Sequence, residues 1–143
     1  MKQLSRFHKA QTLSDEQGSS YEEALREIQN GKKTSSWIWY IFPQIEGLGH
    51  TEISRHYAIQ DIAEAKAYLC DEILRNRLNE ISQALLDLNV SDAVEILGAI
   101  DAMKLKSSMT LFSIADSTNS IYVKVLNQFF DGAVDEKTIE RLK

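Results

Sequence analysis

A regular apolar repeat between residues 71 and 88 constrains the fold of this 143-residue chain more than any other feature. Its aliphatic side chains are spaced by three and four positions: Leu74, Leu78, Ile81, Leu85 and Leu88. This spacing places them on one face of an α-helix. Asp71 stands just before the repeat, where a carboxylate can accept a hydrogen bond from a helix N-terminus. The pattern therefore predicts a long amphipathic helix.

Helix signals recur along most of the remaining chain. Ser20 and Glu23 form a capping box ahead of an apolar pattern of period 3.6, and Gly31 stands where a left-handed helix end is expected. Further caps and apolar periods extend the helical prediction to residues 61–69, 71–88, 91–98, 101–112, 121–130 and 135–142. We therefore predict an all-α fold, a single compact domain of six to eight helices that spans residues 1–143.

The aromatic run at residues 37–42 is the ambiguous segment. Its residue types favour a strand, but no second convincing strand is present to pair with it. Ser35 or Ser36 can cap a helix there, and Pro43 would end that helix at Phe42. The run is therefore predicted to be a buried helix.

Charge and apolar patterning exclude several classes of protein. The net charge is −5, from 16 Lys and Arg against 21 Asp and Glu, so a nucleic-acid partner is not expected. The longest wholly apolar run, residues 37–43, is far shorter than the roughly 20 residues of a membrane helix. The single cysteine, Cys70, permits no intrachain disulfide and fits a reducing compartment. We expect a soluble, cytoplasmic protein without membrane association.

The three histidines His8, His50 and His56 form no zinc-binding motif. We therefore expect neither a metal site nor a cofactor.

Several strings along the chain resemble one family. They are Arg6-Phe7, Ala10-Gln11, Gly31-Lys32-Lys33, Trp37-Ile38-Trp39-Tyr40-Ile41-Phe42-Pro43-Gln44, Gly47-Leu48-Gly49, Tyr57-Ala58-Ile59, Arg77-Leu78, Asp101-x-x-Lys104-Leu105 and Ser107-Ser108-Met109-Thr110-Leu111-Phe112. Together they resemble the bacterial domain-of-unknown-function family 1810, whose members are sometimes labelled calpastatin although nothing in this chain resembles that inhibitor. The resemblance implies a mainly helical fold and no established activity. Relatives usually carry His where this chain has Ser36.

The helical segment 101–112 places charges among apolar side chains. At 100° per residue, Asp101, Lys104 and Ser108 fall on the same face as Leu105 and Leu111. An unpaired charge on an apolar face is costly, and the spacing lets Asp101 and Lys104 pair along the helix. Two interpretations stay open: a partly buried structural ion pair, or the floor of a ligand pocket.

The loop Gly47-Leu48-Gly49 follows the aromatic run and Gln44. A flexible backbone that leads into a short helix can present amide donors to an anion, although two glycines most often mark a turn. Trp37 and Trp39 lie about 200° apart in a helix, so one is expected in the core and the other beside this loop.

From these features we predict one small-molecule pocket. Its walls would come from Lys33, Trp37, Trp39, Gln44, Gly47 and Gly49, and its floor from Arg77, Asp101, Lys104 and Ser108. Arg77 or Lys33 would hold the anionic group of a polar ligand, for example a nucleotide or an ADP-ribose-like compound. The sequence leaves open whether the domain is an enzyme. The alternative is a noncatalytic helical module that binds a protein partner through an exposed aromatic patch.

Overall fold

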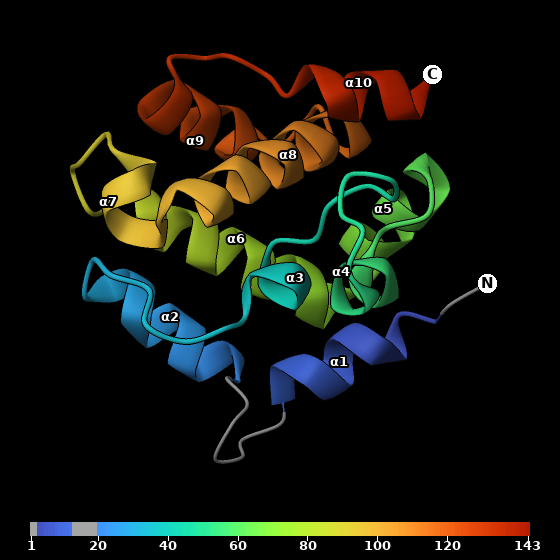
Figure 1. Ribbon diagram of the computed structural model, residues 1–143, viewed down its shortest axis with the longest axis horizontal. Helices are drawn as coiled ribbons and strands as arrows, with labels where there is room; N and C mark the ends of the chain where they lie inside the picture. Colours follow the sequence, from blue (N-terminus) through green and yellow to red (C-terminus); the bar gives the residue numbers. More distant parts are fainter. Residues whose placement is uncertain (1–2, 13–19) are drawn as a thin grey trace.

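The computed structural model describes residues 3–12 and 20–143, and these parts of the chain contain ten helices (Figure 1). The helices in the first half are α1 (Ser5–Thr12), α2 (Tyr21–Gln29), α3 (Ile38–Ile41), α4 (Glu52–Tyr57) and α5 (Ile62–Cys70). Those in the second half are α6 (Glu72–Leu86), α7 (Ala93–Leu97), α8 (Ala99–Ala115), α9 (Ile121–Phe130) and α10 (Glu136–Leu142).

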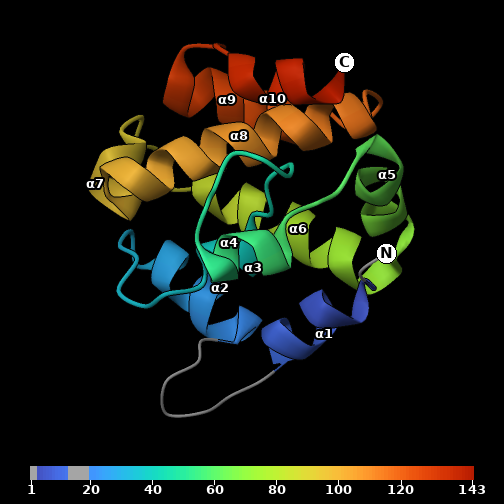
Figure 2. The same cartoon turned by 45° about the vertical axis from the view of Figure 1, so that its right-hand side comes forward.

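Two long helices, α6 and α8, form the centre of the molecule. Helix α8 packs against α3, α5, α7, α9 and α10, while α6 packs against α2, α5 and α9. Helices α1 and α2 lie together on one side of this centre and α9 and α10 on the other, as both views show (Figures 1 and 2). The predicted all-α, single-domain fold is therefore confirmed, although the described residues hold more helices than the six to eight expected.

Most helices begin where the sequence places a capping side chain. Ser20, Asp61, Asp71 and Asp135 each accept a hydrogen bond from the backbone amide three residues later. These bonds satisfy amides that have no partner within the helix. Asp71 therefore begins the long amphipathic helix α6, as its position predicts.

The aromatic run contains the predicted helix, but the expected serine cap is wrong. Helix α3 begins after Trp37, which makes no side-chain cap, and ends at Ile41, since the backbone of Phe42 is no longer helical. The Ser35 hydroxyl instead donates to Glu27, 2.6 Å away. The helix is a single turn because Pro43 follows directly after Phe42.

Helix α1 is the element that the sequence prediction missed. It is only eight residues long, and its buried side chains include Phe7, Ala10 and Gln11. The Phe7 ring packs edge-on against Tyr68, at 5.1 Å between centroids, and Tyr68 in turn contacts Phe112. A short helix with this little apolar surface is stable mainly through such tertiary packing.

The segment between α3 and α5 forms a closed loop whose two ends lie side by side. Ile45 and Ile59 form a single parallel bridge, in which the Ile59 amide donates to Gln44 O and the Glu46 amide donates to Ile59 O, both at 2.8 Å. The loop that contains Gly47 and Gly49 lies between these paired residues. In the described parts of the chain no helix is both long and apolar enough to cross a membrane.

Candidate functional site

Four of the predicted site residues meet beside the first turns of α8, and we call Lys33, Trp39, Asp101 and Lys104 the lysine–aspartate cluster. Lys33 Nζ lies 2.8 Å from Asp101 Oδ2, and Lys104 Nζ lies 3.7 Å from Asp101 Oδ1. Lys104 Nζ also lies 5.0 Å from the centroid of the Trp39 ring. The predicted Asp101–Lys104 pair therefore exists, but the closer partner of Asp101 is Lys33.

The loop that carries Lys33 is held by the buried carboxylate of Glu27. Glu27 accepts hydrogen bonds from the Thr34 and Ser35 amides, the Ser35 hydroxyl and Trp37 Nε1, at 2.6–3.0 Å. Burial alone would raise the pKa of Glu27, but the hydrogen bonds from Ser35, Thr34 and Trp37 together lower it. Glu27 is therefore an anion that fixes Lys33 in position, and Trp37, fully buried, is a core residue.

The two tryptophans differ in burial as their spacing predicts. Trp39 is partly buried and lines a small hollow with Gln44, Gly49 and Ser54. The hollow has a volume of about 10 Å³, which is close to the lower limit for one water molecule. It is too small for a metabolite.

Two buried side-chain polar atoms in the described residues lack hydrogen-bond partners, and both belong to predicted site residues. They are Trp39 Nε1 and Ser108 Oγ. Ser108 lies one turn after Lys104 in α8, whereas its neighbour Ser107 donates to the Met103 carbonyl. A bound water would satisfy either atom.

Gly47 does not face the cluster. Its φ of +99° belongs to the left-handed region, and a Cβ there would lie 2.5 Å from the Arg141 guanidinium. Arg141 Nε donates to the Glu46 carbonyl at 3.0 Å. The glycine loop is therefore anchored to α10, which accounts for the glycine without any ligand.

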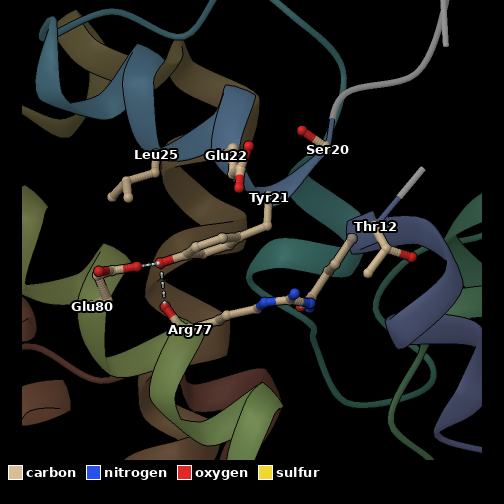
Figure 3. A pocket seen from close by; sticks show the side chains of 8 residues that line it. Thr12, Ser20, Tyr21, Glu22, Leu25, Arg77 and Glu80 are labelled. Carbon is tan, nitrogen blue, oxygen red and sulfur yellow. Dashed lines mark hydrogen bonds between the residues drawn. The ribbon is translucent and has the colours of Figure 1, made fainter. Parts of the chain in front are cut away.

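Arg77 lies in a different place, in the wall of a cavity of about 520 Å³ between α1, α2 and α6, and we call this the Arg77 cavity (Figure 3). Its other lining residues are Gln11, Thr12, Ser20, Tyr21, Glu22, Leu25 and Glu80. None of the other nine predicted site residues lines it. The single pocket expected from the sequence is therefore divided between two positions in the fold.

Tyr21 contacts both charged residues that α6 contributes to the Arg77 cavity. Its hydroxyl donates to Glu80 Oε1 at 2.5 Å and lies 3.1 Å from the Arg77 carbonyl oxygen. The Arg77 guanidinium lies 5.4 Å from the centroid of the Tyr21 ring and donates to Gln11 Oε1 at 3.2 Å. Gln11 is fixed in turn, because its Nε2 donates to the Tyr40 carbonyl. Arg77 is thus oriented by residues from two other helices.

The charged side chains of the Arg77 cavity form no ion pairs among the described residues. Arg77 and Glu80 are three residues apart on α6, a spacing at which an ion pair can form. Within the described part of the chain, however, no carboxylate pairs with Arg77, and no cation pairs with Glu80 or Glu22. Figure 3 shows the Arg77 guanidinium extending towards Thr12, away from Glu80.

A second hollow, of about 660 Å³, lies between α1 and α5, but its charged groups are already paired. Glu64 pairs with Arg6 at 3.1 Å, and His8 Nε2 lies 2.7 Å from Asp71 Oδ2. Burial would raise the pKa of Asp71, but hydrogen bonds from the Leu74 amide and His8 lower it instead. These groups tie α1 to α5 and α6, so this hollow offers a ligand few free polar contacts.

Sequence reasoning missed Tyr21 and Glu80 as site residues. Tyr21 is the first residue of the apolar pattern that follows Ser20, and its hydroxyl adds no periodic signal to that pattern. The spacing of Arg77 and Glu80 on an otherwise regular amphipathic helix was the one available indication.

Comparison with known proteins agrees with the helical fold of this domain. A sequence model of the family described as "Protein of unknown function (DUF1810)" matches residues 1–142, so the chain belongs to this family. The crystal structure of the conserved hypothetical protein Rv1873 from Mycobacterium tuberculosis is similar, with a TM-score of 0.90 and 34% sequence identity over 97% of this chain and 95% of that chain. No protein with a curated function matches the chain.

Proposed function

We propose that this domain binds a small polar molecule that carries an anionic group, and that the anionic group contacts Arg77. The observation that carries the proposal is a guanidinium in the wall of a cavity of about 520 Å³ with no carboxylate partner among the described residues. Cavities of roughly 300–1,000 Å³ are typical of small-molecule sites.

Arg77 has the geometry to bind a carboxylate or a phosphate. A guanidinium has five N–H donors in a planar fork, and Gln11 accepts from only one of its nitrogens. Stacking near the Tyr21 ring and the hydrogen bond to Gln11 limit the rotation of the side chain. Less conformational entropy is then lost when a ligand binds.

The lysine–aspartate cluster supports a ligand less well. Its ammonium groups share the Asp101 carboxylate, and the adjacent hollow has a volume of only about 10 Å³. We therefore assign the cluster a structural role, in which it attaches the loop after α2 to α8.

A nucleoside diphosphate or an ADP-ribose-like compound fits the charge of the Arg77 cavity poorly. The lining of this cavity contains one guanidinium, that of Arg77, and two carboxylates, those of Glu22 and Glu80. These carboxylates would repel a second phosphate. We therefore restrict the proposal to molecules with a single anionic group.

A thermal-shift screen of small anionic metabolites tests the proposal. A ligand at about one hundred times its dissociation constant adds about 2.7 kcal/mol to the free energy of unfolding. We expect ligands that raise the Tm of the wild type and of Arg26→Gln, but not of Arg77→Gln. Arg26 is the matched control because it lies on α2, outside the cavity lining, in an exposed pair with Glu23. A library that raises no Tm, or raises all three equally, would refute the proposal.

One observation favours the alternative, a noncatalytic module for a protein partner. Ile100 and Met103, one turn apart on α8, are 75% and 57% exposed. The aromatic patch expected for such a module does not form from the tryptophans, since Trp37 is fully buried and Trp39 is partly buried. Loss of partner binding in an Ile100→Ser, Met103→Ser variant, with Arg77→Gln unaffected, would support this alternative.

A further inference from the structure

We infer that the ligand of the Arg77 cavity is a compact zwitterion, with its anionic group at Arg77 and an ammonium group at Glu80. This inference rests on the proposed function of the cavity and names the class of its ligand.

The opposite charges of Arg77 and Glu80 are held apart within the cavity. Arg77 and Glu80 come from the same face of α6, yet no ion pair joins them. Tyr21 holds the Glu80 carboxylate through its hydroxyl, while the guanidinium extends in the other direction (Figure 3). The cavity therefore presents one guanidinium and two carboxylates, those of Glu22 and Glu80, without an ion-pair partner among the described residues, which is complementary to a molecule with both charges.

The state of the Tyr21 hydroxyl supports the role of Glu80. Burial, followed by the hydrogen bond and the charge of Glu80, raises the pKa of Tyr21 far above its usual range. The phenol is therefore neutral and donates a hydrogen bond to Oε1 of Glu80. The other oxygen of the Glu80 carboxylate has no partner among the described residues. That oxygen is available to an ammonium group.

The Tyr21 ring lies between the Glu80 carboxylate and the Arg77 guanidinium (Figure 3). Leu25, also on α2, adds a second apolar side chain to the lining. A short methylene chain between the ammonium and the anionic group would pack there, whereas a highly hydroxylated spacer would lose hydrogen bonds to water. Glu22 lies on the same side of the cavity and adds a second acceptor for the ammonium group.

Three probes of matched length separate the contribution of the carboxylate group to binding from that of the ammonium group: 6-aminohexanoate, hexanoate and hexylammonium. Their dissociation constants follow from titrations monitored through backbone amide NMR signals. We expect 6-aminohexanoate to bind at least about tenfold more tightly than either singly charged probe, which is the effect of one charge-assisted hydrogen bond.

Two variants assign each end of the probe. Arg77→Gln is expected to weaken hexanoate and 6-aminohexanoate but not hexylammonium, and Glu80→Gln is expected to weaken hexylammonium and 6-aminohexanoate but not hexanoate. Arg26→Gln is the control and should leave all three affinities unchanged. The Tm of each variant without ligand shows that it is folded; if Arg77→Gln fails to fold, Arg77→Lys, which keeps the charge but not the planar fork, replaces it.

The failures of the two proposals are distinguishable. If hexanoate binds as tightly as 6-aminohexanoate and Glu80→Gln weakens neither, the ligand is simply an anion and the zwitterion inference is wrong while the proposed function stands. If neither hexanoate nor 6-aminohexanoate shifts signals of α1, α2 or α6, the proposed function itself is wrong.

Discussion

Lys33 Nζ lies 2.8 Å from Asp101 Oδ2, and this contact joins the loop after α2 to the first turn of α8. The Lys33 and Asp101 side chains are 12% and 17% exposed, so the pair is neither fully buried nor freely solvated. Exposed pairs contribute at most about 1 kcal/mol, and breaking a buried pair costs about 3–5 kcal/mol.

We therefore expect Asp101→Asn to lower the free energy of unfolding by about 2 kcal/mol, between these limits. Lys104→Met should cost less than about 1 kcal/mol, because Lys104 lies 3.7 Å from Asp101 and is the more distant partner. Urea unfolding of Asp101→Asn, Lys104→Met and Lys33→Met, and of the double variants that combine Asp101→Asn with each lysine substitution, gives the two coupling energies. A larger coupling for Asp101 with Lys104 than with Lys33 would contradict the geometry.

The tryptophans should respond differently to the same substitution. Trp37→Phe removes the indole donor from the buried Glu27 carboxylate and leaves a gap in the core, so we expect a loss of about 2–3 kcal/mol. Trp39→Phe removes a buried donor that has no partner, so we expect a change within about 1 kcal/mol. Equal losses in denaturant unfolding would show that Trp39 Nε1 is satisfied, for example by an internal water.

The lowered pKa of Glu27 predicts a pH dependence of stability. In the unfolded chain Glu27 titrates near its ordinary pKa of about 4.3, and in the folded chain it titrates lower. Its contribution to stability is therefore complete above the unfolded pKa and is lost as the pH falls through the folded pKa. The Glu27→Gln variant should be less stable at neutral pH, and its stability should fall less steeply in acid. Parallel stability curves for the two proteins would refute this.

Gly47→Ala should destabilise the protein by about 1–2 kcal/mol, because its φ is +99° and Cβ would overlap the Arg141 guanidinium. The overlap is relieved when Arg141 is also replaced by Ala, but the backbone strain remains. The double variant should therefore lose less than the sum of the single losses. Strict additivity in thermal unfolding would show that Arg141 can move away without cost.

Local sequence signals were sufficient for most of the helices. Each capping residue and its apolar period lie within one segment, so the boundaries of α6 at Asp71 and of α10 at Asp135 follow from neighbouring residues. Helix α1 was missed because its stability comes from contacts with distant residues such as Tyr68. The cytoplasmic location and the absence of a cofactor remain predictions.

The site was predicted less well because its geometry depends on tertiary contacts. The ion pair of Asp101 with Lys104 lies within one helix and was predicted, whereas its closer partner Lys33 is 68 positions away along the chain. Arg77 was placed in the floor of the predicted pocket with Asp101, Lys104 and Ser108, but no local pattern indicates that it lies against the Tyr21 ring of α2 instead.

The position of ligand-induced shifts in side-chain NMR spectra distinguishes a ligand in the Arg77 cavity from a ligand at the lysine–aspartate cluster. The Nε–Hε signal of Arg77 reports the Arg77 cavity, and the indole Nε1–Hε1 signal of Trp39 reports the lysine–aspartate cluster. During titration with hexanoate and with 6-aminohexanoate, the account predicts a saturable shift of the Arg77 signal and a constant Trp39 signal. An unchanged Arg77 signal, or a saturable shift at Trp39 instead, would contradict it.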